Sequence, residues 1–214
     1  YYTVHVGKAH WSAMGTPGSK PYNLGFMVTI SGHAAGHPQS YLSEQRYGKV
    51  YGKAQAQAVP DLAAYYESRT FLTEALTKEA IKSIETPISR KEPFYLNMAH
   101  YALHTPIMSD PRFVQKYYDQ GLDSIEANYA SLIEGMDKSL GDIMDFLKAK
   151  VVDKNTIIIF MSDNGGLDHH ERGGPKNTHN FPLRSGKGSV YEGGIREPMI
   201  VKWPGVTKPA SINH

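Results

Sequence analysis

The chain has 214 residues, a formal net charge of +2, 40% hydrophobic and 21% charged residues, and no cysteine. This balance is ordinary for a globular protein and gives no basis for nucleic-acid binding. No apolar stretch approaches the length that spans a membrane, and disulfide bonds are excluded.

The first predicted strand covers residues 1–6, and Lys8 and His10 follow it after Gly7. In extended backbone, residues two apart share a face, so the ammonium of Lys8 and the imidazole of His10 can meet one anionic group. A surface lysine beside an unrelated histidine explains the same pair, so both interpretations stay open here.

Residues 12–66 are rich in Gly, Pro, Ser, His and Tyr and show little periodicity. They predict a long irregular segment with one short strand at 26–30. Long loops inside compact domains are usually functional or mobile. His33 and His37 lie in this segment and are candidates for substrate binding, with ordinary loop histidines as the alternative.

Regular structure is expected again from residue 70. One apolar helix face is marked by Leu72, Leu76, Ala80 and Ile84. Thr70 or Ser68 is the expected N-cap of this helix, and Pro87 is expected past its end. A buried strand is predicted at 94–98, and His104 follows it as another polar group beyond a strand end.

A short helix is predicted at 110–118, with Pro111 at its first position. The longest predicted helix covers 124–150, where apolar residues recur at 3.6-residue spacing. The β-branched run at 156–161 predicts a strand buried on both faces. The strand at 94–98, the long helix and this strand are expected to form a right-handed βαβ unit.

Asp163 and Asn164 directly follow the strand at 156–161. The carboxyl ends of parallel strands are where open α/β sheets place their ligands. One carboxylate and one amide offer hard oxygen atoms, which suit Ca²⁺ or Mg²⁺ better than zinc. A simple strand-ending turn is the alternative, because Asp-Asn-Gly is common turn chemistry.

The last third of the chain adds a histidine-rich loop and a glycine-flanked lysine. Residues 167–180 are expected to form a loop over the site, with His179 as a further substrate-binding candidate. Lys187 stands between two glycines, which let the backbone come close to an anion. The spacing is not that of a Walker phosphate loop. A final strand is predicted at 199–203.

Four groups of residues stand in a telling order. They are Gly7-Lys8-x-His10, then His104-Thr105-Pro106, then Ser162-Asp163-Asn164-Gly165, and last Gly186-Lys187-Gly188 with Tyr191–Arg196, Pro198 and Trp203-Pro204-Gly205. Together they resemble the motifs of type I, formylglycine-dependent sulfatases in the alkaline phosphatase superfamily. The pieces at 23–26 and 36–41 are most similar to bacterial polysaccharide sulfatases.

The resemblance implies an α/β fold, a three-layer sandwich around a mostly parallel central sheet, with residues 1–214 forming part of its catalytic domain. The family carries an earlier C/S-x-P-x-R segment, whose Cys or Ser becomes the formylglycine nucleophile, and paired metal-binding aspartates. This chain has no cysteine, and Glu85 stands where the nucleophile of a Pro87-Ile88-Ser89-Arg90 match would belong. Ala9 replaces a usual tryptophan. We expect an internal fragment, without the C-terminal subdomain, that is inactive without the rest of its protein.

The resemblance also implies the reaction. The whole protein is expected to hydrolyse sulfate esters of a carbohydrate or an aryl sulfate, and to be periplasmic or secreted. Ca²⁺, or possibly Mg²⁺, held partly by Asp163 and Asn164, is the expected metal, and formylglycine is expected from the missing segment. No nucleic-acid or membrane partner is expected.

The remaining roles follow from the same resemblance. Lys8 and Lys187 would neutralise the sulfate oxygens, and His104 would protonate the leaving alcohol. His10 would assist deprotonation of the formylglycine hydroxyl. We expect these residues and the metal ligands to converge on one pocket at the carboxyl ends of the strands.

Two other functions fit parts of the pattern. Phosphatases and phosphodiesterases of the superfamily share the fold but use Thr or Ser nucleophiles and usually two metals, and the Lys187 loop argues against them. A non-catalytic module that binds sulfated glycans would keep the lysines and histidines but lack the nucleophile. A purely structural role has no support in the sequence.

Overall fold

The computed structural model describes residues 1–49, 56–167 and 180–212. The chain divides into two compact units, Tyr1–Phe146 and Leu147–His214. No helix in the described residues is long and apolar enough to cross a membrane.

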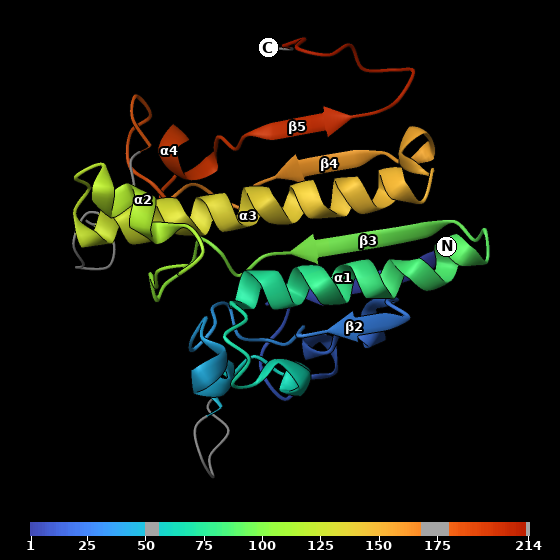
Figure 1. Ribbon diagram of the computed structural model, residues 1–214, viewed down its shortest axis with the longest axis horizontal. Coiled ribbons are helices and arrows are strands. Elements are labelled where there is room, and N and C mark those ends of the chain that lie inside the picture. The colour runs from blue at the N-terminus through green and yellow to red at the C-terminus, as the bar shows by residue number, and fades with distance from the viewer. Residues whose placement is uncertain (50–55, 168–179, 213–214) are drawn as a thin grey trace. The chain divides into compact units, whose positions relative to one another are not determined.

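The first unit is built on a three-stranded parallel sheet in the order β2-β1-β3 (Figure 1). The strands are β1 (Tyr2–Gly7), β2 (Val28–Ile30) and β3 (Phe94–Ala99). The register sets Val6 opposite Ile30 on one side and Met98 on the other. Because the strands are parallel, their carboxyl ends lie at one edge. The three strands predicted in this region and the parallel sheet are confirmed.

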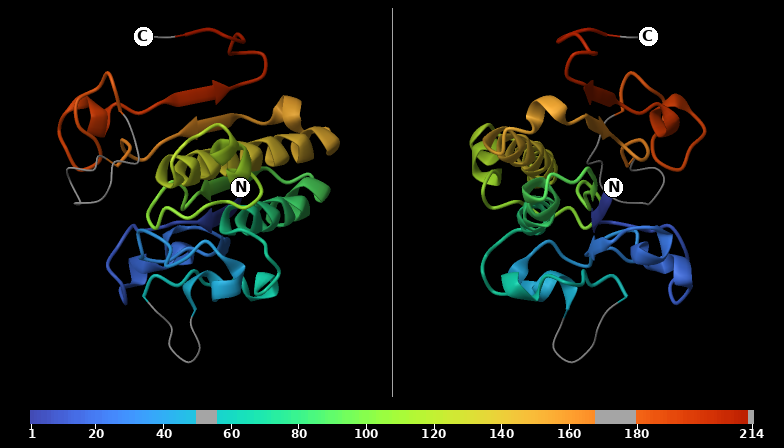
Figure 2. Two further views of the ribbon diagram at one scale, coloured as in Figure 1. Left: turned by 60° about the vertical axis from the view of Figure 1, so that its left-hand side comes forward. Right: turned by 90° about the vertical axis from the view of Figure 1, so that its right-hand side faces the viewer.

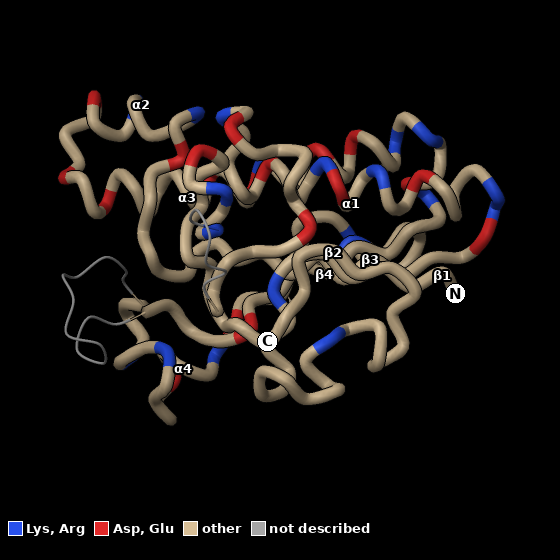
Figure 3. Tube along the Cα trace, turned by 90° about the horizontal axis from the view of Figure 1, so that it is seen from below, with Lys and Arg blue, Asp and Glu red and all other residues tan. Residues whose placement is uncertain are grey.

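Helix α1 (Leu72–Ser89) packs on all three strands of this sheet. The four residues of its predicted apolar face are fully buried: Leu72, Leu76, Ala80 and Ile84. Lysines and glutamates are interspersed along the helix (Figure 3), and Glu74 pairs with Lys78 at 2.7 Å. The apolar face therefore holds α1 against the sheet.

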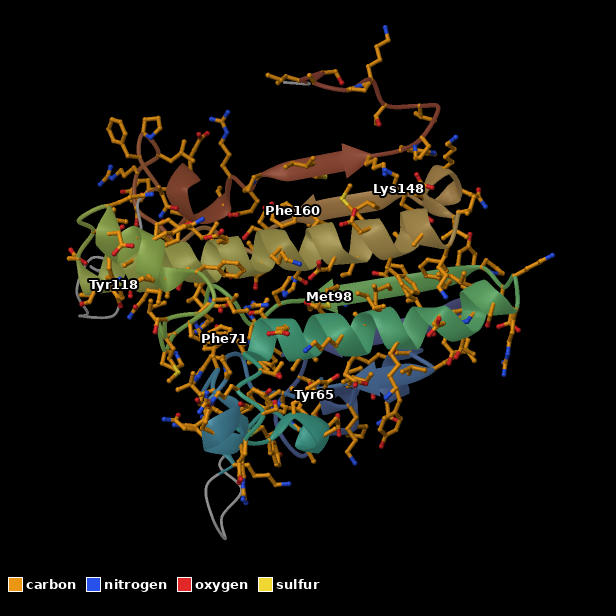
Figure 4. All side chains as sticks on the ribbon, viewed as in Figure 1. Tyr65, Phe71, Met98, Tyr118, Lys148 and Phe160 are labelled. Atoms are coloured by element: carbon orange, nitrogen blue, oxygen red, sulfur yellow. The ribbon has the colours of Figure 1, made fainter. Side chains whose placement is uncertain are left out.

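Both predicted ends of α1 are wrong. Phe71 is the N-cap, at the amino end of the helix in Figure 4, while the hydroxyls of Ser68 and Thr70 bond to each other at 2.8 Å. Pro87 lies inside the helix and is buried. Its burial with the apolar face compensates for the backbone hydrogen bond that proline cannot donate.

Helix α2 covers Val114–Asp119 and starts later than predicted. The carboxylate of Asp110 accepts hydrogen bonds from the backbone and the guanidinium of Arg112. Such side-chain bonds to nearby backbone offer the chain an alternative to helix. Pro111 therefore lies in a turn before α2 and not at its first position.

Helix α3 covers Ser124–Ala149, as predicted. The carboxylate of Asp123 accepts from the backbone N–H groups of Ile125 and Glu126, which caps the amino end. Within the first unit, a buried hydrogen bond of 2.6 Å from Thr77 to Ser139 joins α1 to α3. This bond fixes the contact between the two long helices.

Short 3₁₀ helices occupy much of the irregular segment. They are Pro17–Ser19, Pro21–Leu24, Ser43–Gly48 and Ala63–Tyr65. In the views of Figures 1 and 2 they lie beside β2 and not beside β3. The segment is therefore ordered locally, although it lacks long elements.

The second unit contains β4 (Ile158–Met161), β5 (Met199–Lys202), α4 (Glu192–Ile195) and a 3₁₀ helix at Asp153–Asn155. β4 and β5 pair antiparallel, with Ile158 opposite Lys202 and Met161 opposite Met199. Both strands were predicted from the sequence.

The predicted environment of β4 is wrong. Among the described strands β4 pairs with β5 alone, in a two-stranded antiparallel sheet, and is not a parallel strand of a βαβ unit with β3. Ile159 is 58% exposed and Met161 is 62% exposed, so the strand is not buried on both faces. A β-branched run favours a strand but does not encode its partner, because strand propensity depends on tertiary context.

Candidate functional site

The polar residues after β1 and β3 lie together at the carboxyl edge of the parallel sheet. The backbone N–H of Lys8 donates to the carbonyl of Ala99 at 2.8 Å, which places Lys8 directly beyond the ends of both strands. Gly7 has φ +99°, and a Cβ at this position would clash with the Ala99 carbonyl. The glycine of the first motif therefore permits the close pairing that positions Lys8.

His10 is held by the loop that follows β2. Its backbone N–H donates to the carbonyl of His33 at 3.0 Å. Gly36 lies against its imidazole, and a Cβ there would be 2.7 Å from the Cε1 atom of His10. His10 is exposed, so its ring is available at the surface of this edge.

His33 holds its own loop through both ring nitrogens. The backbone N–H of Ala35 donates to Nδ1 at 2.8 Å, and Nε2 is 3.0 Å from the carbonyl oxygen of Ala58. Because a carbonyl only accepts, Nε2 carries the proton and the ring is neutral in this arrangement. Neither nitrogen is left for a substrate, so this geometry favours a loop-holding role over the predicted substrate contact.

His37 and His104 form a stacked pair. Their ring centroids are 5.4 Å apart, at an interplanar angle of 17°. The Nδ1 atom of His104 lies 3.2 Å from the carbonyl oxygen and 3.1 Å from Oγ1 of Thr105, and Nδ1 of His37 lies 3.1 Å from the Pro38 carbonyl. The first unit thus brings together two predicted site histidines from different loops.

A hydrogen bond connects the loops after β2 and β3. The hydroxyl of Tyr101 donates to the carbonyl of Ser31 at 2.8 Å, and both groups are buried. His10 is held by the first of these loops and His104 lies in the second. The two candidate proton-transfer residues therefore belong to one connected loop cluster, which we call the histidine edge: Lys8, His10, His33, His37 and His104.

The sequence interpretation gave no role to two other histidines near this edge. The Nδ1 atom of His100 is buried without a hydrogen-bond partner among the described residues, and burial lowers the pKa of His100 to about 4. His5 is fully buried between the Gly7 carbonyl and the side chain of Asn97, and burial lowers its pKa also. Their place in or directly after a predicted strand is the one sequence signal for their burial.

The second unit has its own cluster, in which backbone bonds dominate. The N–H of Gly165 donates to the carbonyl of Gly194 at 3.1 Å, and the N–H of Lys187 donates to the carbonyl of Gly166 at 2.9 Å. A Cβ at Gly165 would clash with the carbonyl of Gly193. The Asp163-Asn164 turn and the Lys187 loop are therefore joined through glycines, and we call this region the glycine junction (residues 162–166, 180–189 and 191–194).

Side chains complete the glycine junction. The hydroxyl of Ser162 donates to the Asn164 carbonyl at 2.8 Å. The amide of Asn180 donates to the carbonyls of Gly166 at 3.1 Å and Ser185 at 3.0 Å, while its Oδ1 accepts from the Gly166 N–H at 3.2 Å. One amide thus bridges the two loops. The sequence interpretation missed Asn180, whose partner loop lies on both sides of it.

The donor chemistry at Asp163 and Asn164 suits a hard divalent cation, but the number of donors falls short. The part of the chain that the structure describes contains no group of three or more His, Cys, Asp or Glu residues that could hold a metal ion. Ca²⁺ takes about six to eight oxygen ligands. These residues would therefore supply only part of a metal shell.

Two predictions stay outside what this geometry tests. His179 lies in residues 168–179, outside the described part of the chain. The histidine edge and the glycine junction belong to different units, so the convergence of all site residues on one pocket stays a prediction.

Comparison with known proteins gives a consistent result. The family model described as Sulfatase matches residues 1–214. A "Sulfatase" of Formosa agariphila is 36% identical over 153 residues, which cover 66% of this chain and 26% of that protein. The N-acetylgalactosamine-6-sulfatase of Mus musculus is 33% identical over 145 residues, which cover 67% of this chain and 26% of that protein. The chain thus spans about a quarter of these relatives.

A solved structure shows the same fold. The structure described as Ps i-CgsB in complex with k-i-k-neocarrahexaose superposes with a TM-score of 0.77 at 30% sequence identity. The match covers 96% of this chain and 45% of that one. The parallel sheet with its covering helices is therefore an arrangement that a known protein shares along almost all of this chain.

Proposed function

Because this chain belongs to the sulfatase family, we propose that the protein of which it is part hydrolyses sulfate esters of a carbohydrate. The observation that carries the proposal is the match of the family over the whole chain, with its lysines and histidines at the histidine edge and the glycine junction. A sugar substrate is supported by the names of two relatives, one an N-acetylgalactosamine-6-sulfatase and one solved with a neocarrahexaose.

Two lysines would bind the sulfate group. Lys8 stands beyond the ends of β1 and β3, and Lys187 stands in the glycine junction. Their ammonium groups would neutralise negative charge on the non-bridging oxygens, which grows as the ester bond breaks. Such preorganised electrostatic stabilisation is usually the largest single contribution to catalysis.

Two histidines would move protons. With Nδ1 of His104 beside the carbonyl and hydroxyl of Thr105, we assign Nε2 as the donor to the leaving alcohol oxygen. His10 would accept a proton from the hydroxyl of the nucleophile when sulfate is released. A positioned general acid or base contributes ~10²–10⁴-fold to the rate.

The groups that this chain lacks would come from elsewhere in the protein. Ca²⁺, or Mg²⁺ in its place, would be held in part by Asp163 and Asn164 and would act as a Lewis acid toward the sulfate oxygens. Formylglycine from another segment would serve as the nucleophile. We also propose a periplasmic or secreted location, in keeping with an extracellular glycan as substrate.

The test is sulfate release by the full-length protein. A panel should include N-acetylgalactosamine 6-sulfate, a carrageenan oligosaccharide, 4-nitrophenyl sulfate and the matching phosphate ester. We expect sulfate ester turnover that falls ~10²–10³-fold in Lys187→Ala, since one electrostatic donor is worth about that much. Lys208→Ala removes an exposed lysine of the same unit and should leave turnover unchanged.

Phosphate ester turnover without sulfate ester turnover would contradict the proposal and favour a phosphatase. Tight binding of sulfated glycan without any turnover would favour a binding module. Equal losses in Lys187→Ala and Lys208→Ala would show that Lys187 has no special role in the reaction.

A further inference from the structure

A buried tyrosine holds the backbone of the turn that carries His104. The side chain of Tyr41 is fully buried, and its ring stacks on Phe71 with centroids 5.4 Å apart. Its hydroxyl lies 2.8 Å from the carbonyl oxygen of Tyr101 and 2.9 Å from the carbonyl oxygen of His104. Since both are carbonyls, the single O–H is shared between two acceptors.

The bonded atoms close the turn from both ends. The backbone N–H of His104 donates to the carbonyl of Tyr101 at 2.9 Å, so residues 101–104 form a tight turn. The hydroxyl of Tyr41 contacts the first and the last carbonyl of this turn. Burial raises the pKa of Tyr41 well above its usual value, so the hydroxyl stays a donor at any pH where an enzyme works.

The ring of His104 depends on this backbone. Its Nδ1 atom is beside the next residue, Thr105, and the direction of Nε2 is then set by where the 101–104 turn places the Cα atom. A shift of the turn would rotate the imidazole without removing any of its own atoms. Small misplacements of a catalytic group cost rate even when the group itself is intact.

We propose that the Tyr41 hydroxyl is a positioning group that aims His104 at the leaving oxygen of the substrate. The inference rests on the proposed function, in which His104 is the general acid. In that step the nucleophile bonds to sulfur, and the electron pair of the breaking sulfur–oxygen bond goes to the bridging oxygen. That oxygen takes the proton from His104 Nε2 and leaves as a neutral alcohol.

The chain offers a matched control. Tyr47 is also fully buried, and its hydroxyl donates to the carbonyl of Thr70 at 2.8 Å, away from the 101–104 turn. Tyr41→Phe and Tyr47→Phe each remove one buried hydroxyl and keep the ring. Their effects on folding should be similar, while only Tyr41→Phe should affect His104.

Two substrates separate positioning from general damage. A sugar alcohol is a poor leaving group and needs a proton from the acid, whereas 4-nitrophenolate leaves readily without one. In the full-length protein, Tyr41→Phe should lower kcat on a sulfated sugar ~10-fold or more, as part of the ~10²–10⁴-fold contributed by a general acid. On 4-nitrophenyl sulfate its kcat should stay within about twofold of the unaltered protein, and Tyr47→Phe should resemble the unaltered protein on both substrates.

Hydrogen exchange supplies a readout that does not depend on turnover. The amide of His104 should exchange faster in Tyr41→Phe than in Tyr47→Phe, because its turn has lost the hydroxyl that closes it. This measurement is made below the melting temperature of both variants, so it holds even if Tyr41→Phe is less stable.

Equal losses on the two substrates, or unchanged exchange at His104, would overturn the positioning role. Absence of sulfate release by the unaltered protein contradicts the proposed function instead and removes the inference with it. The selective loss on the sugar, together with faster exchange, is the result that the proposal requires.

Discussion

The histidine edge and the glycine junction are held together in different ways. In the histidine edge, side chains bond to distant backbone: Tyr41 to residues 101 and 104, Tyr101 to Ser31, and His33 to residues 35 and 58. In the glycine junction, backbone bonds to backbone where glycines allow close approach. The first region should therefore be sensitive to loss of side-chain atoms, and the second to their addition.

Adding one methyl group should cause the largest change. Gly165→Ala places a Cβ against the carbonyl of Gly193, so the junction has to shift at a cost of about 1–3 kcal/mol in the free energy of unfolding. Gly141→Ala is the control, since its Cβ in α3 would meet nothing within 4 Å. That variant should be stabilised by roughly 0.5–1 kcal/mol. Urea unfolding of the full-length protein measures both, and a neutral Gly165→Ala would remove the contrast between the two regions.

Acid should act on the first unit more than on the second. His100 is neutral in the fold because burial lowers its pKa to about 4, whereas an unfolded histidine has a pKa of about 6.5. The unfolded state therefore takes up the proton first, and stability is lost as the pH falls from about 6.5 to 4.

His100→Gln tests this effect. Between pH 7 and pH 5 the unaltered protein should lose about 2 kcal/mol more than the variant. The described residues of the second unit contain no histidine, so acid should not loosen the glycine junction by this route. The comparison is made by denaturant unfolding at both pH values, and parallel curves would mean that His100 is protonated in the fold.

Removing the His33 ring should have a smaller effect. His33→Ala leaves the Ala35 N–H and the Ala58 carbonyl without their partner, at a cost of about 1–2 kcal/mol for two neutral hydrogen bonds. His33→Asn can still accept from Ala35 and should recover about half of this loss. Thermal melting of the two variants decides the point. Identical melting temperatures would show that the Nδ1 bond contributes nothing.

The sequence predicts local elements well because their signals are local. Leu72, Leu76, Ala80 and Ile84 are spaced as one helix face, and all four are buried. The partner of β4 carries no such signal, since it is set by residues far along the chain. Pro87 was expected outside α1, but burial outweighs its missing hydrogen bond.

The same division holds for the candidate site. Lys8, His10 and His104 were found because they follow apolar strands, and the structure places them at one edge. Tyr41 looks like an ordinary aromatic residue of a loop, and its acceptors lie 60 and 63 residues away. A residue that acts by holding another one leaves no motif, so contacts are needed to find it.

The most direct test of the account is a structure of the full-length protein with a bound sulfated oligosaccharide. The account predicts that one sulfate group contacts the ammonium groups of both Lys8 and Lys187, with His104 Nε2 within hydrogen-bond distance of the bridging oxygen, about 2.6–3.2 Å. A sulfate bound by only one of the two regions, with the other lysine well over ~10 Å away, would contradict the single site.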